Sequence, residues 1–160
     1  MFGRWIAGFD WLLERLAMLF VVVLLGTVTA GIVSRAAGHP FSFTDEASGF
    51  LMVWLACLGW MLATRRGAHI RIRFFLERLP GGSRRVTEVV IHLGAVLLGA
   101  VIAWKSLHLI EANSDVEATT MPIATAWMYV PLLPAGLVTL AQGLADLRRS
   151  LVRGAAEASV

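Results

Sequence analysis

Residues 64–88 of this chain read TRRGAHIRIRFFLERLPGGSRRVTE. This basic stretch separates two apolar runs and contains seven arginines, namely Arg65, Arg66, Arg71, Arg73, Arg78, Arg84 and Arg85. Short loops rich in Lys and Arg stay on the cytoplasmic side of a membrane. The stretch 111–126 instead carries Glu111, Asp115 and Glu117 and no basic residue. We therefore predict a cytoplasmic loop at 64–88 and a periplasmic loop at 111–126.

The composition on either side of this loop is that of an integral membrane protein, since 58% of the residues are apolar and only 16% are charged. The apolar runs cover about residues 16–33, 47–63, 89–110 and 127–144. Each is close to the roughly 20 residues that a helix needs to cross about 30 Å of hydrocarbon. The predicted fold is one all-α membrane domain over residues 1–160 with four transmembrane helices. The remaining loop, 34–46, is predicted to be periplasmic.

Basic residues also lie next to the predicted spans at both ends of the chain, at Arg4, Arg15, Arg148, Arg149 and Arg153. Arg35 is the exception, in a loop predicted to face outward. Both termini are therefore predicted to be cytoplasmic, which an even number of spans permits, in a multi-pass protein of a bacterial-type membrane. The basic residues of the predicted cytoplasmic face favour contact with membrane lipids. Because its charge adjoins apolar spans, no nucleic-acid partner is expected.

The amino-terminal segment has two open interpretations. Apolar side chains recur there at helical spacing opposite polar ones, as Trp5, Ile6, Phe9, Leu12, Leu13 and Leu16 opposite Arg4, Asp10, Glu14 and Arg15. This pattern predicts either an amphipathic helix on the inner membrane surface or a simple extension of the first span. A secretory signal is disfavoured, because the apolar run of about 18 residues exceeds the 7–15 typical of a signal.

Small residues recur every four positions in three of the runs, as Gly26, Ala30 and Ser34, as Ala95, Gly99 and Ala103, and as Ala135, Thr139 and Gly143. In lipid, helices associate by close approach of small side chains. We therefore expect most of these stripes to pack within the chain and some to meet a larger partner. Pro131 and Pro134 fall early in the fourth run, where they predict a kink or a delayed helix start.

The chain offers few groups for chemistry. Cys57 is the only cysteine and lies within the second span, so its expected role is that of a small apolar core residue. The sequence has no P-loop, no glycine-rich dinucleotide turn and no paired Cys or His motif. We therefore predict no enzyme activity, no metal site and no cofactor in this chain.

Two rival classes of membrane protein make specific demands on the spans. A haem- or quinone-binding anchor of a respiratory complex needs a second His at the depth of the first. His92 and His108 instead lie on one predicted helix, about 24 Å apart, so a ligand would have to come from His39, His69 or a partner. A small multidrug exporter needs a carboxylate within the membrane on its first helix. In this chain the acidic residue nearest to that position, Glu14, lies before the apolar core begins, which disfavours this class. The respiratory anchor stays as the alternative function.

Eight residues within the second span or next to its ends are candidates for contact with a partner or with the membrane interface: Asp45, Glu46, Gly49, Trp54, Trp60, Arg65, Arg66 and His69. Glu46 lies where a carboxylate must reach water or pair with a cation, and Gly49, one turn below, permits close approach of another helix. Trp54 and Trp60 are six residues apart and so lie on different helix faces. At most one of them should face lipid.

The second span and its flanks also carry the most distinctive motifs, with Asp45-Glu46, Trp54, Leu58-Gly59 and a basic exit that ends in Gly67-Ala68-His69-Ile70. A second stretch, Met121-Pro-Ile-Ala-Thr-Ala-Trp127, leads into Tyr129-Val-Pro-Leu-Leu-Pro134. In these motifs, and over nearly its whole length, the chain resembles the small membrane subunit (DctQ-type) of tripartite ATP-independent periplasmic (TRAP) transporters. One departure is that family members often place an acidic residue shortly after the His-Ile pair, where this chain has Arg71 and Arg73.

The resemblance implies an accessory or scaffold subunit of an ion-gradient-driven transporter for organic acids or related small solutes. Its implied partners are a large multi-helix membrane subunit, which it would anchor and stabilise, and a periplasmic substrate-binding protein. Coupling to Na⁺ or H⁺ would belong to the large subunit. The residues agree with a supporting role, because a transport pathway needs polar groups near the membrane midplane. The midplanes of these spans are nearly all Leu, Val, Ala, Gly and Trp.

Overall fold

The structure, a computed structural model, describes residues 2–65 and 81–157, with side chains over 8–65 and 86–150. Its long helices are α1 (Phe2–Ala36), α2 (Phe43–Arg65), α4 (Gly81–Ala112) and α5 (Leu132–Glu157). A short 3₁₀ helix, η1 (Thr125–Met128), precedes α5. Each long helix lies in or overlaps a segment long and apolar enough to cross a membrane, namely Gly8–Ala36, Phe43–Arg65, Val86–Ala112 and Thr125–Ser150. The predicted all-α fold with four spanning helices is confirmed.

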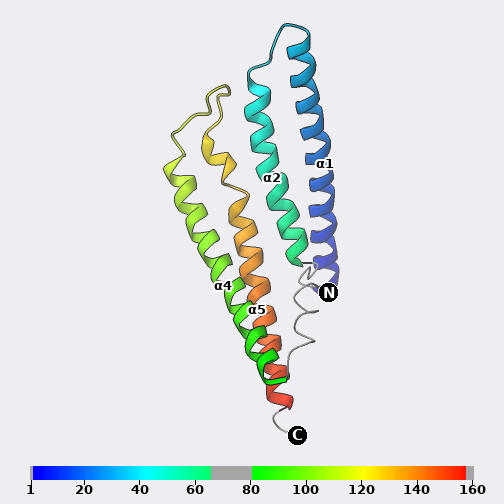
Figure 1. The fold of residues 1–160 in the computed structure, drawn as a ribbon, viewed down its shortest axis with the longest axis vertical. Coiled ribbons are helices and arrows are strands. Elements are labelled where there is room, and N and C mark those ends of the chain that lie inside the picture. The colour runs from blue at the N-terminus through cyan, green and yellow to red at the C-terminus, as the bar shows by residue number, and fades with distance from the viewer. Residues whose placement is uncertain (1, 66–80, 158–160) are drawn as a thin grey trace.

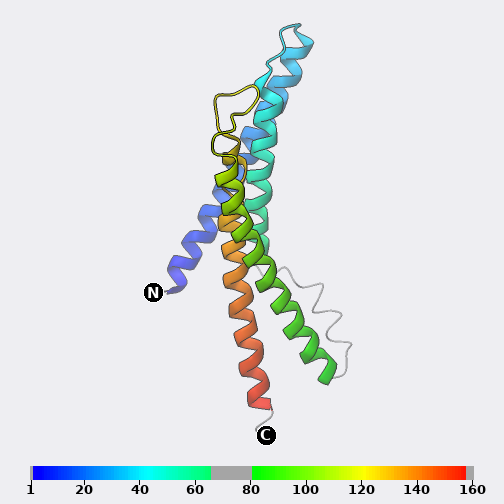
Figure 2. The ribbon, with the colours of Figure 1, turned by 90° about the vertical axis from the view of Figure 1, so that its left-hand side faces the viewer.

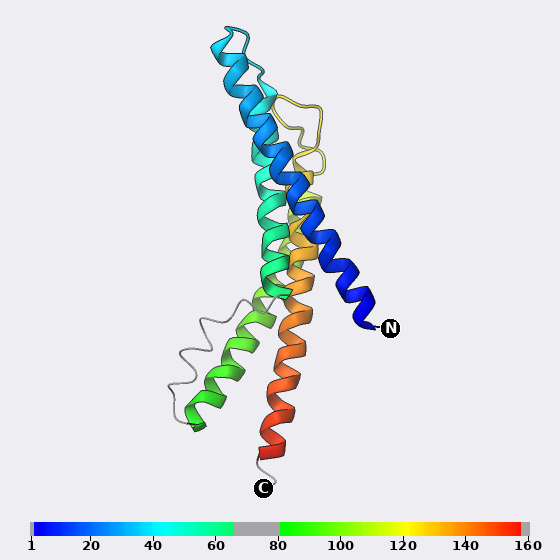
Figure 3. The ribbon, with the colours of Figure 1, turned by 90° about the vertical axis from the view of Figure 1, so that its right-hand side faces the viewer.

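The four helices lie side by side in the order α4, α5, α2, α1 (Figure 1). Among the described helices, close backbone contacts join α4 to α5, α5 to α2, and α2 to α1, and they join no other pair of long helices. Viewed from the two sides, the amino-terminal part of α1 and the start of α4 lean in opposite directions away from α5 (Figures 2 and 3). The fold is therefore an open layer of two antiparallel pairs, with α2 and α5 as its inner helices.

Both ends of the chain lie at one end of this layer, and the 37–42 and 113–124 connections lie at the other (Figure 1). Arg65 at the end of α2 and Arg148 and Arg149 late in α5 share the end that holds the termini. Apart from Arg35 in the last turn of α1, the arginines of the described helices thus lie toward the end that holds the termini, as the sequence suggests. That the basic end faces the cytoplasm stays a prediction from the positive-inside rule.

The amino-terminal segment belongs to α1, which runs without a break from Phe2 to Ala36. Of the two open interpretations, the extension of the first span is the one observed, and a separate interfacial helix is not. Extending a formed helix costs much less than nucleating a second one, and no proline interrupts residues 2–36. At 35 residues α1 is about 52 Å long, well beyond the hydrocarbon thickness, so its first turns project past the apolar layer.

The α4–α5 pair packs backbone against backbone through glycine. A Cβ added at Gly99 would lie 2.5 Å from the backbone nitrogen of Leu140, and one at Gly136 would lie 2.7 Å from that of Ala103. A Cβ at Gly143 would meet Val96 at 3.0 Å. The small residues predicted for the third and fourth spans therefore do pack within the chain. Such close approach replaces the hydrophobic driving force that lipid does not supply.

The small-residue stripe of the first span is the one that does not pack within the described part of the chain. Gly26 and Ala30 are exposed, and only Ser34 is buried. The face of α1 turned toward α2 instead repeats with alternating steps of four and three residues: Leu13, Ala17, Phe20, Leu24, Thr27, Gly31 and Ser34. A strict four-residue spacing drifts around a helix of 3.6 residues per turn, whereas this alternating spacing follows one seam.

The core of the layer lies where α1, α2 and α5 meet, and it consists of Leu13, Cys57, Leu58, Met61 and Ala135. The expected apolar core role of Cys57 is confirmed, since the side chain is buried. Outside this core, the outer faces of α1 and α4 expose large apolar side chains such as Val22, Leu97 and Trp104, each about two-thirds exposed. Surfaces of this kind fit lipid or a protein partner and not water.

The two prolines delay the last helix, as predicted. Residues 125–128 form only the 3₁₀ turn η1, and α5 begins at Leu132, directly after Pro131. Pro134 then lies in the first turn of α5, where its missing N–H would have no intrahelical partner. Residues 125–131 therefore form turns, and the α-helix begins only at Leu132.

The glycine contact predicts unequal effects of two substitutions on α4. In Gly99→Ala the new methyl group must push the α4 and α5 backbones apart, so we expect a loss of about 1–3 kcal/mol of unfolding free energy. Gly94→Ala is the matched control, because a Cβ there meets nothing within 4 Å. Thermal unfolding of both variants in the same detergent is the measurement. Equal melting temperatures for the two variants would contradict the packing.

Candidate functional site

Glu46 at the outer end of α2 holds a loop that is distant in sequence. Its carboxylate accepts hydrogen bonds from the backbone N–H of Thr119 at 2.8 Å and from that of Thr120 at 2.7 Å, and a third from the Thr120 hydroxyl. The partner is therefore neither water alone nor a cation, the two options expected from the sequence. Two adjacent backbone N–H groups suit the two oxygens of one carboxylate. This contact, which we call the Glu46 clamp, joins the α1–α2 pair to the α4–α5 pair.

The basic residue that the sequence places near the outer end of α2 is Arg35, and it pairs with Asp45 and not with Glu46. Arg35, in the last turn of α1, forms an ion pair with Asp45, and both side chains are largely exposed. Gly38, at φ +77°, makes the turn between them, in a conformation that favours glycine. An exposed ion pair of this kind is worth less than about 1 kcal/mol. Asp45 therefore closes the α1–α2 turn and leaves Glu46 for the other loop.

The loop that Glu46 binds is folded and not a loose connection. The backbone N–H of Ala118 donates to the carbonyl of Ile123 at 2.9 Å, and that of Thr125 donates to Val116 at 2.7 Å. Sequence reasoning described this segment as an acidic outer loop that ends in the Met121–Trp127 motif, and it missed Thr119 and Thr120. The adjacent threonines before Pro122 are typical turn residues, and they were the available signal.

Arg65 forms a second clamp at the opposite end of α2. Its guanidinium pairs with the carboxylate of Asp10 and lies 5.1 Å from the centroid of the Phe9 ring. The side chain of Arg65 is 21% exposed, so this pair is better shielded from solvent than the Arg35–Asp45 pair. Arg65 thus ties α1 to α2 in addition to marking the basic end. Asp10 was missed as its partner. The other two predicted inner-end residues, Arg66 and His69, lie outside the described residues.

The two tryptophans of α2 have different surroundings. Trp54 stacks on Phe20 of α1, with ring centroids 5.6 Å apart, and its Nε1–H donates to the carbonyl of Trp127 at 3.0 Å. Trp60 is 43% exposed. The two rings therefore do not share a face, as the sequence predicts. Gly49 has open space where a Cβ would lie, so none of the described helices approaches it closely.

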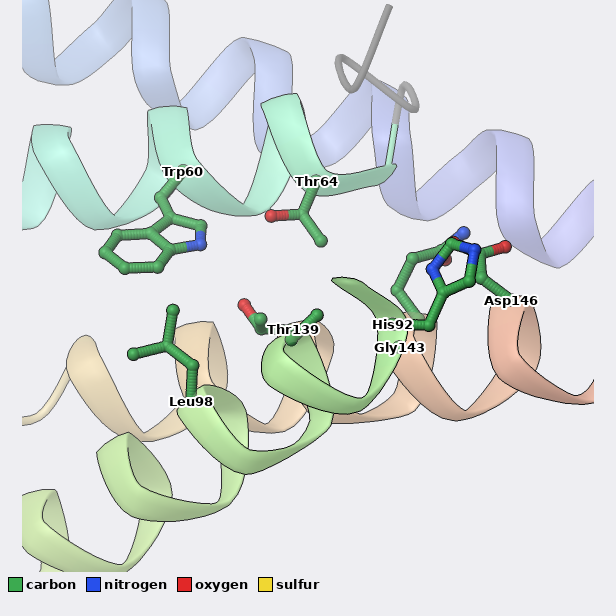
Figure 4. A pocket seen from close by; sticks show the side chains of 9 residues that line it. Trp60, Thr64, His92, Leu98, Thr139, Gly143 and Asp146 are labelled. Atoms are coloured by element: carbon green, nitrogen blue, oxygen red, sulfur yellow. The ribbon is translucent and has the colours of Figure 1, made fainter. Parts of the chain in front are cut away.

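A pocket of about 280 Å³ lies between α2, α4 and α5 (Figure 4), next to Trp60. Its lining comprises Trp60, Thr64, His92, Ala95, Leu98, Thr139, Gln142, Gly143 and Asp146. The α2 and α4 backbones make no close contact, and α5 supplies the floor. Sequence reasoning had named His92 but assigned it no neighbours, because this pocket depends on how three helices are placed.

Comparison with known proteins supplies the family. A family model described as tripartite ATP-independent periplasmic transporters, DctQ component, matches residues 24–153. The ectoine TRAP transporter small permease protein TeaB of Halomonas elongata is 31% identical over 126 residues, which cover 75% of this chain and 65% of TeaB. The sialic acid TRAP transporter small permease protein SiaQ of Vibrio cholerae is 25% identical over 126 residues, covering 78% of this chain and 72% of SiaQ.

A third relative has a different chain organisation. The isethionate TRAP transporter permease protein DctMQ of Oleidesulfovibrio alaskensis is 24% identical over 91 residues, which are 57% of this chain but only 14% of that protein. The matched region thus forms a small part of a much longer permease chain. With the family match over most of its length and four helices of spanning length, the chain belongs to the DctQ component family of tripartite ATP-independent periplasmic transporters, as a multi-pass protein of the bacterial inner membrane.

Proposed function

We propose that this chain is the scaffold of its transporter, a subunit that anchors and stabilises a large multi-helix transport subunit and works with a periplasmic substrate-binding protein. The observation that carries this proposal is the open layer of helices, whose outer members expose large apolar side chains along their length. A chain that carried solute by itself would need polar groups along an enclosed path near the midplane. The interior here is an apolar cluster around Cys57 and Met61.

The division of work with a large subunit has support from the isethionate permease. There, a segment similar to this chain occurs within one polypeptide many times its length. Two segments that can share one chain are expected to work side by side in the membrane. For the present chain we propose that the same association is made between separate polypeptides.

The substrate proposed is an organic acid or a related small solute, since the relatives carry the names of transporters for ectoine, sialic acid and isethionate. Coupling to Na⁺ or H⁺, and any cofactor, are assigned to the large subunit. The alternative, a haem or quinone anchor of a respiratory complex, receives no support from the relatives, which are transporter permease proteins.

Purification of the tagged chain from its native membranes in mild detergent tests the scaffold proposal. We expect one large membrane protein to co-purify in stoichiometric amount, together with the capacity for substrate uptake when both are reconstituted with the binding protein. Respiratory subunits in the eluate, or full uptake by the large subunit alone, would overturn the proposal.

Glu46 should matter more to this assembly than a carboxylate nearby. Glu46→Lys removes the acceptor of the Thr119 and Thr120 hydrogen bonds and frees the outer loop, so we expect a several-fold loss of uptake at equal membrane abundance. Glu111→Lys, in the last turn of α4, is the matched control, because the Glu111 side chain bonds to no other described residue. Equal uptake by the two variants would rule out a role for the clamp.

The proposed orientation can be tested with one cysteine at each end. In a Cys57→Ala background, Ser114→Cys should react with a membrane-impermeant maleimide in spheroplasts, and Ala155→Cys should react only after lysis. The reason is that the basic end is proposed to lie in the cytoplasm. The reverse labelling pattern would invert the topology.

A further inference from the structure

The pocket between α2, α4 and α5 contains polar groups that lack partners. Within the described part of the chain, Thr64, His92 and Gln142 line the pocket and make no hydrogen bond through their side chains. All three are half-buried and lie within segments of spanning length. A polar group that stays unpaired at membrane depth is costly. The pocket therefore favours an occupant that has polar atoms.

Polarity changes along the pocket in one direction. Figure 4 shows Trp60 and Leu98 at one end and His92 and Asp146 at the other, with Thr64 and Thr139 between them. The polar end is the end of the layer that holds Arg65, Arg148 and Arg149. The gradient thus runs from the middle of the layer toward its charged rim. A phospholipid has the same order of groups, with acyl carbons toward the midplane and the headgroup at the rim.

The charge at the polar end selects among headgroups. The Asp146 side chain is 24% exposed, and the Arg149 guanidinium lies 3.5 Å from its carboxylate, at the limit of a hydrogen bond. The Asp146 carboxylate and the Gln142 amide oxygen are acceptors in the pocket lining that suit the N–H donors of a primary ammonium group. His92, which also lines the pocket at this end, can donate a ring N–H to a phosphate.

We propose that this pocket binds the headgroup of an aminophospholipid, phosphatidylethanolamine, from the leaflet at the basic end of the molecule. The ammonium pairs with Asp146, and the phosphate lies toward His92. The first acyl carbons lie against Trp60 and Leu98. The volume of about 280 Å³ is close to the lower end of small-molecule sites. It suits a headgroup and a few methylene groups and is too small for a helix.

This site differs from the general attraction of a basic rim for anionic lipid. Arginines at the rim favour any anionic headgroup, whereas the Asp146 carboxylate repels a headgroup with a net negative charge. Phosphatidylcholine has the same net charge and phosphate as phosphatidylethanolamine, but its quaternary nitrogen has no N–H to donate. The preference among three lipids with identical acyl chains therefore reports on the acceptors of the pocket.

The test is the retention of lipid by the purified full chain, with any large subunit that accompanies it, in native mass spectrometry. After exchange into mixed micelles with equal amounts of dioleoyl phosphatidylethanolamine, phosphatidylcholine and phosphatidylglycerol, we expect one phosphatidylethanolamine to be retained preferentially. In Asp146→Asn that preference should fall on the order of tenfold, the effect of one charge-assisted hydrogen bond. Gln142→Leu, which keeps the charge, should weaken it less. Asp115→Asn, in the outer loop, should leave it unchanged.

Two outcomes would overturn the proposal. One is a lipid measurement without the expected selectivity. The unaltered chain would retain the three lipids equally, or the preference would be unchanged in both Asp146→Asn and Gln142→Leu, as a general effect of lipid shape would be. The other comes from a photo-reactive side chain in place of Leu98. Cross-linking to lipid is expected, whereas cross-linking to a polypeptide alone would assign the pocket to a partner. Neither outcome depends on the scaffold function, which co-purification tests separately.

Discussion

The contact between the α4 and α5 backbones at Gly99 and Gly136 is the interaction on which the rest of the structure depends. In lipid no hydrophobic force draws two helices together, so close approach of small residues must do it. Because this pair is so close, α5 is tied to α4, and the delayed start of α5 at Leu132 fixes where η1 and the 113–124 loop lie. That loop then reaches Glu46, 73 residues away in sequence from Thr119.

The two helix pairs are joined by fewer contacts than the helices within the α4–α5 pair. The contacts between the two pairs lie at three depths. They are the Glu46 clamp at the outer end, the hydrogen bond from Trp54 to the Trp127 carbonyl below it, and the cluster of Cys57 and Ala135 further in. Each is a small contact, and together they span the layer. An open layer held in this way offers two long apolar edges to its surroundings, as a subunit that supports a larger one requires.

Sequence reasoning predicted what depends on composition and local spacing, and it failed where the answer depends on how helices are placed. Hydropathy and arginine position gave four spans with the termini at one end, and Pro131 gave the late start of the last helix. The spacing of Gly26 and Ala30 marks a face of α1 that is exposed and is not the one turned toward α2, because small residues mark a possible contact without naming its partner. The pairing of Arg65 with Asp10 joins separate helices, and neither residue identifies the other.

The placement of α4 also explains why a pocket with some polar groups exists inside a membrane layer. α4 packs on α5 and makes no close contact with α2, so the space above α5 and between its two neighbours is left to something else. A bilayer does not leave such a space empty, and the side chains around it are not those of a lipid-facing surface, since His92, Gln142 and Asp146 turn toward it. If an aminophospholipid fills the space, it replaces the missing α2–α4 contact with a headgroup that bonds to both sides. The lipid would then be part of the fold, and the rigidity of the basic end would depend on the membrane in which the protein lies.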